Sequence, residues 1–339
     1  MFPRLIKSVS AALLTCCLVG TGANAQSATD FPTKPIRLVL PFAPGGLSDI
    51  TARMLSEEVR QILGQPVVID YKPGGNGVVA FGDVARQPAD GYTLTIGVNT
   101  TNLYNPIIRA HEMPFDVRKV ITPVTGLVEA PQLFLATTVN FPPNNVKEFI
   151  EHAKKNPNKF NHSVVGLGSN SHFDFLLMQR RHGFSIVTVP ARAGAGTAQV
   201  DLISGDVQVA MLNAATFTPV VQSGKLKALA ISGKERSPHL PDVPTLKEQG
   251  FDDIGIGTWT VLFAPVGTPK PVMDKLHQAF TTALKTDKVR EQMRRFSTTS
   301  FVHENPDAAK RWLDGEFDKW EKIVDEFRTE LKMPEKKAN

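Results

Sequence analysis

The sequence predicts an α/β protein of two lobes, each a sheet covered by helices. Short apolar strands alternate with amphipathic helices over residues 33–99 and again over residues 146–231, a pattern typical of mainly parallel, doubly wound sheets. Two long apolar stretches, residues 120–138 and 257–264, could each carry the chain from one lobe to the other. Loops of the two lobes would then face each other across a ligand cleft.

The length of the chain also favours two lobes. Its 339 residues exceed what a single hydrophobic core usually serves. We therefore assign residues 26–127 and 258–339 to lobe 1, and residues 128–257 to lobe 2.

Residues 1–25 have the pattern of an export signal. Arg4 and Lys7 precede a largely apolar stretch at residues 9–19, and Ala23-Asn24-Ala25 is a small-residue cleavage site. The apolar stretch is shorter than the roughly 20 residues that a membrane span needs. We expect a signal peptide that is cleaved after Ala25 and a protein exported to the periplasm.

Composition excludes several kinds of chemistry in the exported chain. Both cysteines, Cys16 and Cys17, lie in the signal segment, which removes disulfides, thiol catalysis and cysteine–metal sites. Loss of Arg4 and Lys7 lowers Lys plus Arg from 38 to 36 against 33 Asp plus Glu, so the net charge falls from +5 to +3. These charges are dispersed, unlike the basic stripe of a nucleic-acid-binding protein. The eight histidines include no H-E-x-x-H motif, and we expect neither a metal nor a cofactor.

Lobe 1 should begin with a strand at residues 36–40, a glycine-rich loop and a helix. Pro41-Phe-Ala-Pro-Gly-Gly46 forces a turn, and Ser48 or Asp49 is the natural N-cap of the helix that follows. The next predicted elements are a strand at 67–69, a helix at 75–86 and a strand at 92–98. The loops that follow the three strands, residues 42–49, 71–77 and 99–105, should meet at one edge of the sheet.

The rest of the chain continues this alternation. In lobe 2 the predicted helices are residues 146–155, 171–182, 194–204 and 216–223, and the predicted strands are residues 163–165, 186–189, 207–212 and 226–231. Helices at 271–284 and 287–296 precede a last helix that begins with Asn305 as N-cap and Pro306 at its first position. The apolar face of this last helix, which includes Trp320 and Leu331, should pack on lobe 1.

Each lobe carries a glycine-rich loop that could bind an anion at a helix N-terminus. In lobe 1 this loop is residues 42–49, which lack the G-x-G-x-x-G and Lys-Ser/Thr patterns of nucleotide sites. In lobe 2 it is Gly166-Leu-Gly-Ser-Asn-Ser-His172, whose serines and Asn170 could cap the next helix or bind an anion. We expect His172 to stay neutral and to support this loop.

Other residues at loop positions are candidates with an equally plausible structural role. Arg192 follows a predicted strand and could bind a carboxylate bidentately, or could be a solvated surface side chain. Asn213 ends the next strand in the same way. Phe42 and Tyr104 could flank a flat ligand or belong to the core.

An exported serine hydrolase is the alternative interpretation of the lobe 2 loop, with Ser169 as nucleophile and His172 as base. Two observations speak against it. Both residues would lie on one helical turn without an orienting carboxylate, and no G-x-S-x-G motif is present.

A set of short motifs in a fixed order gives the sequence a family resemblance. In chain order they are Pro41-Phe-Ala-Pro-Gly-Gly46 with Asp49, Gly64-Gln-Pro-Val67, Tyr71-Lys-Pro-Gly-Gly75, Ala89-Asp-Gly-Tyr92, Asn105-Pro106, Gly166-x-Gly-Ser-x-Ser-His172, Gly205-x-Val207, Gly224-Lys-Leu226, Arg236-Ser237, Pro241-Asp-Val-Pro244 and Phe263-Ala-Pro-x-Gly267. Together they resemble the Bug family, the TctC-like extracytoplasmic solute-binding receptors of tripartite tricarboxylate transporters. The resemblance covers essentially the whole exported chain.

The resemblance implies a type II periplasmic-binding-protein fold that encloses a carboxylate between its lobes and performs no catalysis. It implies a membrane permease of one large and one small subunit as partner, with a sensor for a signalling system as the alternative, and we expect a monomer. In this family two loops bind one carboxylate, and the matching residues here are 42–49 and 168–171. We expect Asp49 to brace the first of these loops. The predicted ligand-binding residues are Phe42, Ala43, Gly45, Gly46, Leu47, Ser48, Asp49, Asn99, Thr101, Gly168, Ser169, Asn170, Ser171, Ala191, Arg192 and Asn213, with His172 as loop support.

Departures from the family pattern bear on the ligand. Val98-Asn-Thr-Thr-Asn102 stands where the family often has Thr-Ser-Gly-Thr-His, and Ala191-Arg192-Ala193 stands where it often has Tyr-Lys-Gly. Leu212 replaces an Asp that commonly precedes Asn213, which argues against an amino-acid ligand because a buried ammonium needs a carboxylate partner. We therefore expect a larger dicarboxylate, aromatic ones such as terephthalate included, whose far end Arg192 could meet.

Overall fold

The computed structural model describes residues 30–130, 133–233, 235–251 and 257–326, together with Arg328, Leu331 and Met333. The predicted signal peptide and Phe327 of the predicted last helix lie outside the described residues. Pro32–Asn339 forms one compact unit, to which the following description applies. Within its described part, no helix is both long enough and apolar enough to cross a membrane.

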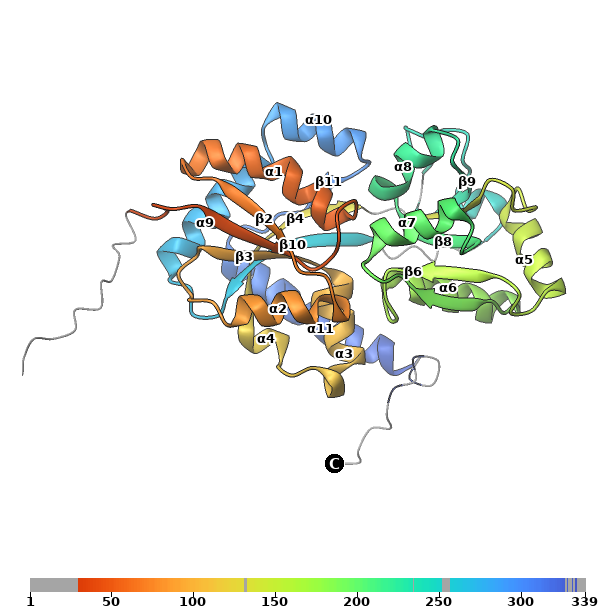
Figure 1. Cartoon of the computed structure of the whole chain (residues 1–339), viewed down its shortest axis with the longest axis horizontal. Coiled ribbons are helices and arrows are strands. Elements are labelled where there is room, and N and C mark those ends of the chain that lie inside the picture. Colours follow the sequence, from red (N-terminus) through yellow and green to blue (C-terminus); the bar gives the residue numbers. More distant parts are fainter. Residues whose placement is uncertain are drawn as a thin grey trace, which may run out of the picture. The chain divides into compact units, whose positions relative to one another are not determined.

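The described chain forms two mixed sheets flanked by helices (Figure 1), which confirms the predicted α/β class. The first sheet has the order β11-β4-β10-β3-β1-β2 and the second the order β7-β6-β8-β5-β9. The strands of the first sheet are β1 (Ile36–Leu40), β2 (Val67–Tyr71), β3 (Thr93–Val98), β4 (Ile121–Ala130), β10 (Thr258–Pro265) and β11 (Thr299–Ser300). Those of the second are β5 (Leu133–Thr138), β6 (Asn161–Val164), β7 (Val187–Pro190), β8 (Val209–Asn213) and β9 (Leu226–Ile231).

The two long apolar stretches are strands, and they make the sheets mixed instead of mainly parallel. β1 pairs in parallel with β2 and β3, and β6 pairs in parallel with β7 and β8. β10 runs antiparallel to β3 and β4, and β5 runs antiparallel to β8 and β9. The predicted parallel pattern therefore holds only where a helix returns the chain between strands, because that connection is what makes neighbouring strands parallel. The chain changes sheets between Ala130 and Leu133, and returns between Ile231 and Thr258.

Helices cover both faces of the first sheet. They are α1 (Leu47–Leu63), α2 (Val78–Ala85), α3 (Asn105–Ile108), α4 (Val117–Val120), α9 (Lys270–Ala283), α10 (Asp287–Arg295) and α11 (Pro306–Asp325). In Figure 1, α1 and α10 lie on one side of this sheet, and α2, α4 and α11 lie on the other. The predicted cap of α11 is confirmed, since the side-chain oxygen of Asn305 accepts a 2.9 Å hydrogen bond from the Ala308 N–H.

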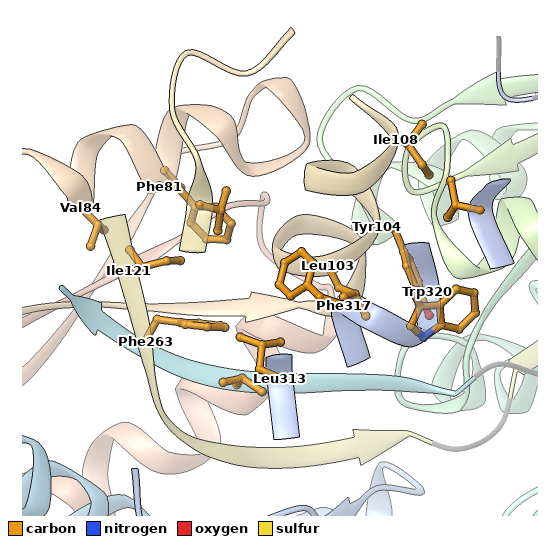
Figure 2. Close-up of a cluster of buried hydrophobic side chains, with 14 of the residues drawn as sticks. Phe81, Val84, Leu103, Tyr104, Ile108, Ile121, Phe263, Leu313, Phe317 and Trp320 are labelled. Carbon is orange, nitrogen blue, oxygen red and sulfur yellow. The ribbon is translucent and has the colours of Figure 1, made fainter. Parts of the chain in front are cut away.

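The apolar face of α11 packs on lobe 1, as predicted. Figure 2 shows Leu313, Phe317 and Trp320 of this helix against Tyr104 and Phe263. The Trp320 and Tyr104 rings meet edge-on with centroids 4.5 Å apart, and only 1% of Tyr104 is exposed. Tyr104 is therefore a core residue and does not flank a ligand. The helix itself ends at Asp325, before the predicted Leu331.

Strand alternation divides the core of lobe 2 into two layers. The helices of this lobe are α5 (Val146–Lys155), α6 (Asn170–His182), α7 (Ala195–Ser204) and α8 (Ala214–Gln222). Met211 faces the layer that includes Phe149 of α5, whereas its neighbour Leu212 faces the layer that includes Phe217 of α8. Successive strand residues point to opposite faces, so α5 and α6 cover one face of the sheet and α7 and α8 the other.

Candidate functional site

A cavity lies where loops of both lobes meet. It encloses about 420 Å³ of non-protein space, part of which opens to solvent. Its walls consist of Phe42, Gly46, Leu47, Ser48, Val98, Thr100 and Thr258 from lobe 1, and of Val165, Asn170, Ser171, Ala195, Met211, Leu212 and Asn213 from lobe 2.

The cavity is uncharged but rich in hydrogen-bond donors. Among the described residues that line it, none has a charged side chain, while hydroxyl and amide groups alternate with apolar ones. Four helices, α1, α6, α7 and α8, begin at or directly beside lining residues. The first N–H groups of a helix have no partner within the helix, and its dipole makes that end positive. The arrangement therefore favours an anion without supplying a counter-charge.

Asp49 holds the lobe 1 loop in place from behind the cavity wall. One of its carboxylate oxygens accepts a 2.8 Å hydrogen bond from the Gly45 N–H. The other accepts from Arg53 Nε at 2.8 Å and from the Tyr71 hydroxyl at 2.6 Å. Both oxygens are thus used, and Asp49 is not among the lining residues. This is the bracing role expected from the sequence.

The N-cap prediction for α1 is wrong. Gly46 is the N-cap, with extended backbone dihedrals, and the helix begins at Leu47, so Ser48 and Asp49 lie in its first turn. Because the Asp49 carboxylate reaches back to Gly45, the loop is closed by the first turn and needs no capping side chain. Ser48 does not cap the helix, and it lines the cavity.

His172 supports the lobe 2 loop in an analogous way. Its Nδ1 accepts a 2.9 Å hydrogen bond from the Gly168 N–H, and Ser169 caps α6 by accepting from the His172 N–H. Burial lowers the pKa of the His172 imidazole from 6.5 to about 4, so the ring is neutral near pH 7 and can act as an acceptor. Since Nδ1 is occupied by Gly168, it does not serve Ser169 as a base. The nucleophile–base pair of the hydrolase alternative is not formed through Nδ1.

The lobe 2 loop also contacts lobe 1 directly. The side-chain nitrogen of Asn170 donates a 2.8 Å hydrogen bond to the Thr258 hydroxyl at the start of β10. Next to it, the hydroxyls of Ser169 and Ser171 lie 3.1 Å apart, and Ser171 faces the cavity. Asn170 therefore links the two lobes at the cavity wall.

The polar run after β3 is helical, although the sequence predicts a loop there. Thr100–Tyr104 forms a π-helical turn that continues into α3. Thr101 turns back and bonds the N–H and C=O of Val98 at 3.0 and 2.9 Å, while Asn99 donates to the Gly257 carbonyl at 3.0 Å. Neither lines the cavity, whereas Thr100, which was not predicted, does. Side chains of an extended segment point alternately to opposite sides, whereas those of a helical turn are distributed around its axis. The helical turn therefore directs Thr100, and not Asn99 or Thr101, towards the cavity.

The structure separates the other lobe 2 candidates. Asn213 lines the cavity and caps α8, its oxygen accepting from the Thr216 N–H at 3.0 Å. Ala191 is packed in the core of the lobe. Arg192 is exposed and is not a lining residue, so in this conformation it supplies no contact to a ligand. Of the first-loop candidates, Ala43 and Gly45 lie outside the wall, as do Gly168 and Ser169 of the second loop.

The apolar part of the wall was largely missed by sequence reasoning. Val98, Val165, Ala195, Met211 and Leu212 line the cavity without having been predicted as ligand contacts, and so does the polar Thr258. Most of them lie within a residue or two of the end of a strand or the start of a helix, and Leu212 directly precedes the predicted Asn213. Their position at the edge of the cleft could have indicated contact with a ligand, but apolar residues at such positions are equally typical of a core.

Known proteins resemble the chain in sequence and structure. Residues 51–328 match the family described as TctC, the tripartite tricarboxylate transporter family receptor. Protein BugT of Bordetella pertussis is 31% identical over 310 residues, 91% of this chain and 94% of BugT. Among solved structures, MatC (Rpa3494) from Rhodopseudomonas palustris with bound malate is 32% identical with a TM-score of 0.78, covering 87% of this chain and 100% of MatC. R. palustris Rpa4515 with adipate is 29% identical with a TM-score of 0.80, covering 87% of this chain and 97% of Rpa4515.

Proposed function

The chain belongs to the TctC family of tripartite tricarboxylate transporter receptors, and on this premise we propose that it captures a carboxylate in the cavity between its lobes. Members of this family are solute-binding receptors and not enzymes, which removes the hydrolase alternative. We further propose that the protein works in the periplasm after cleavage at Ala25. It would deliver its ligand to a membrane permease of one large and one small subunit.

The uncharged, donor-rich cavity is the observation that carries the carboxylate proposal. Helix N-termini bind anions because their N–H groups are unpaired and their dipoles are positive. A cationic ligand would find no carboxylate in the described wall, so its buried charge would go uncompensated. Malate and adipate, which the two R. palustris relatives hold, are both dicarboxylates.

A dicarboxylate with an apolar middle fits the wall best. Met211, Leu212 and Val165 supply apolar surface, and the helix starts lie in both lobes, so both ends of such a ligand could meet N–H groups. The second carboxylate would be met by Asn213 and the starts of α7 and α8, since Arg192 is exposed. Aromatic dicarboxylates such as terephthalate remain within this class.

Ligand capture requires only a difference in affinity between open and closed lobes. The first loop offers donors from lobe 1, and the lobe 2 groups add theirs only when the lobes meet. A ligand that contacts both lobes stabilises the closed form by its extra contacts there.

Titration calorimetry of the purified protein tests the proposal with adipate, malate, terephthalate and leucine. We expect a dicarboxylate to bind at least about 100-fold more tightly than leucine, because an ammonium lacks a partner in the wall. Ser171→Ala should weaken that dicarboxylate by about tenfold, the cost of one hydrogen bond to a charged group. The matched variant Ser223→Ala, at the end of α8 and away from the cavity, should leave affinity unchanged. Tightest binding of leucine would overturn the proposal.

A further inference from the structure

The two lobes touch directly beside the cavity, along backbone that carries small residues. The Ala43 N–H donates a 3.1 Å hydrogen bond to the Ala193 carbonyl, which joins the lobe 1 loop to the segment before α7. A Cβ placed on Gly45 would lie 3.6 Å from the Cα of Gly196, an ordinary van der Waals distance. The lobes thus meet main chain to main chain.

Two glycines of lobe 2 leave no room for a side chain at this contact. A Cβ on Gly194 would lie 2.7 Å from the ring of Phe42. A Cβ on Gly196 would overlap the carbonyl oxygen of Pro44, closer than real Cβ atoms approach. Phe42 could turn its ring aside, but the Pro44 oxygen belongs to the backbone, so a side chain at 196 would force the loop to shift or the lobes to stay apart.

Backbone conformation does not account for glycine at position 196. Gly194 has a φ of +96°, a conformation that favours glycine whether or not the Phe42 ring lies nearby. Gly196 lies in the first turn of α7, outside the left-handed region, and alanine is a better helix former than glycine at such a position. The carbonyl oxygen of Pro44, from the other lobe, is what excludes a side chain at position 196.

We propose that Gly196 is a closure-determining residue: the lobes reach their closed contact because position 196 carries no side chain. The hydrogen bond from Ala43 to Ala193 belongs to the same contact. The effect on ligand affinity rests on the proposed function, whereas the contact between the lobes does not.

A cysteine pair across the contact tests closure without a ligand. Gly46 and Ala195 are suited to it, because a Cβ on Gly46 would lie 3.7 Å from the Cβ of Ala195, close to the mean separation in disulfides. The pair G46C/A195C is placed in the full chain with C16S and C17S, which leaves no other cysteine. Mass spectrometry under non-reducing conditions follows the rate of disulfide formation.

Adding Gly196→Ala to this chain should slow disulfide formation by at least about tenfold. Gly315→Ala is the matched control, since Gly315 also lies within a helix, α11, but a Cβ there would meet nothing within 4 Å. It should leave the rate unchanged. In the native sequence, Gly196→Ala should also weaken adipate binding at least about tenfold, while urea unfolding without ligand shows no loss of stability.

The outcomes separate the two proposals. The closure inference is overturned if Gly196→Ala leaves the rate of disulfide formation unchanged. It is also overturned if the cysteine pair forms no disulfide when Gly196 is present. A loss of unfolding free energy in Gly196→Ala also overturns it, since the Pro44 contact would then belong to the folded core. Normal cross-linking of the cysteine pair, together with no dicarboxylate binding by the native sequence, would reject the proposed function and leave the closure inference standing.

Discussion

Acidification should destabilise the lobe 2 loop through His172. The pKa of its buried imidazole is lowered from 6.5 to about 4, and its Nδ1 accepts from the Gly168 N–H only while the ring is neutral. The unfolded chain takes up this proton near pH 6.5 and the folded chain only near pH 4. The stability that depends on neutral His172 is therefore complete above pH 6.5 and is lost as the pH falls from 6.5 to about 4.

The two pKa values set the size of the effect. Between about pH 7.5 and about pH 5, the difference in proton binding amounts to about 2 kcal/mol of unfolding free energy. His162 contributes in the same direction, since complete burial lowers its pKa well below 6.5. A comparison that removes only His172 is needed to separate the two rings.

Urea unfolding at both pH values makes that comparison in the native protein and in His172→Gln. The native protein should lose about 2 kcal/mol more than the variant on acidification, because glutamine does not titrate. His111→Gln provides the same substitution at an exposed histidine outside the lobe 2 loop, where the side chain is 48% exposed. Equal losses in native protein and His172→Gln would refute the assignment of this pH dependence to His172.

Four further substitutions test the site and the core. Arg192→Ala should change dicarboxylate affinity less than about twofold in calorimetry, because the Arg192 side chain is exposed. Asn213→Ala should weaken the affinity by about tenfold, because Asn213 lines the cavity. A marked loss of affinity in Arg192→Ala would instead place that guanidinium at the ligand. Asp49→Ala should lower the unfolding free energy by about 2 kcal/mol and weaken binding, since Gly45 and Arg53 lose their acceptor, and unchanged urea unfolding would contradict the bracing role. Phe149→Ala, at a fully buried ring, should cost about 3 to 5 kcal/mol in the same assay, and a loss under about 1 kcal/mol would mean that the lobe 2 core repacks without a cavity.

Local patterns in the sequence were sufficient to locate most elements. The bounds of α5 and β9 match the prediction, and Asn305 caps α11 as expected. The two glycine-rich loops do precede helices at the cavity. These features depend on residues a few positions apart, whose periodicity and capping chemistry are visible in the chain itself.

Only the tertiary structure decided which residues face the ligand space. Thr100 lines the cavity instead of Asn99 and Thr101 because Asn99 is held by Gly257, 158 positions away, and the run coils into a π-helical turn. Arg192 turned out to be exposed, although its place after a strand allowed either role.

The sequence by itself determined the α/β class, the family and the two loops that start helices at the cavity. The tertiary structure decided that the crossing stretches enter the sheets antiparallel, that Asp49 braces its loop from behind, and that Gly196 meets the Pro44 carbonyl. The reason is physical. Secondary structure follows from interactions between near neighbours in the chain, whereas strand direction, side-chain exposure and steric contact depend on segments that meet only after folding.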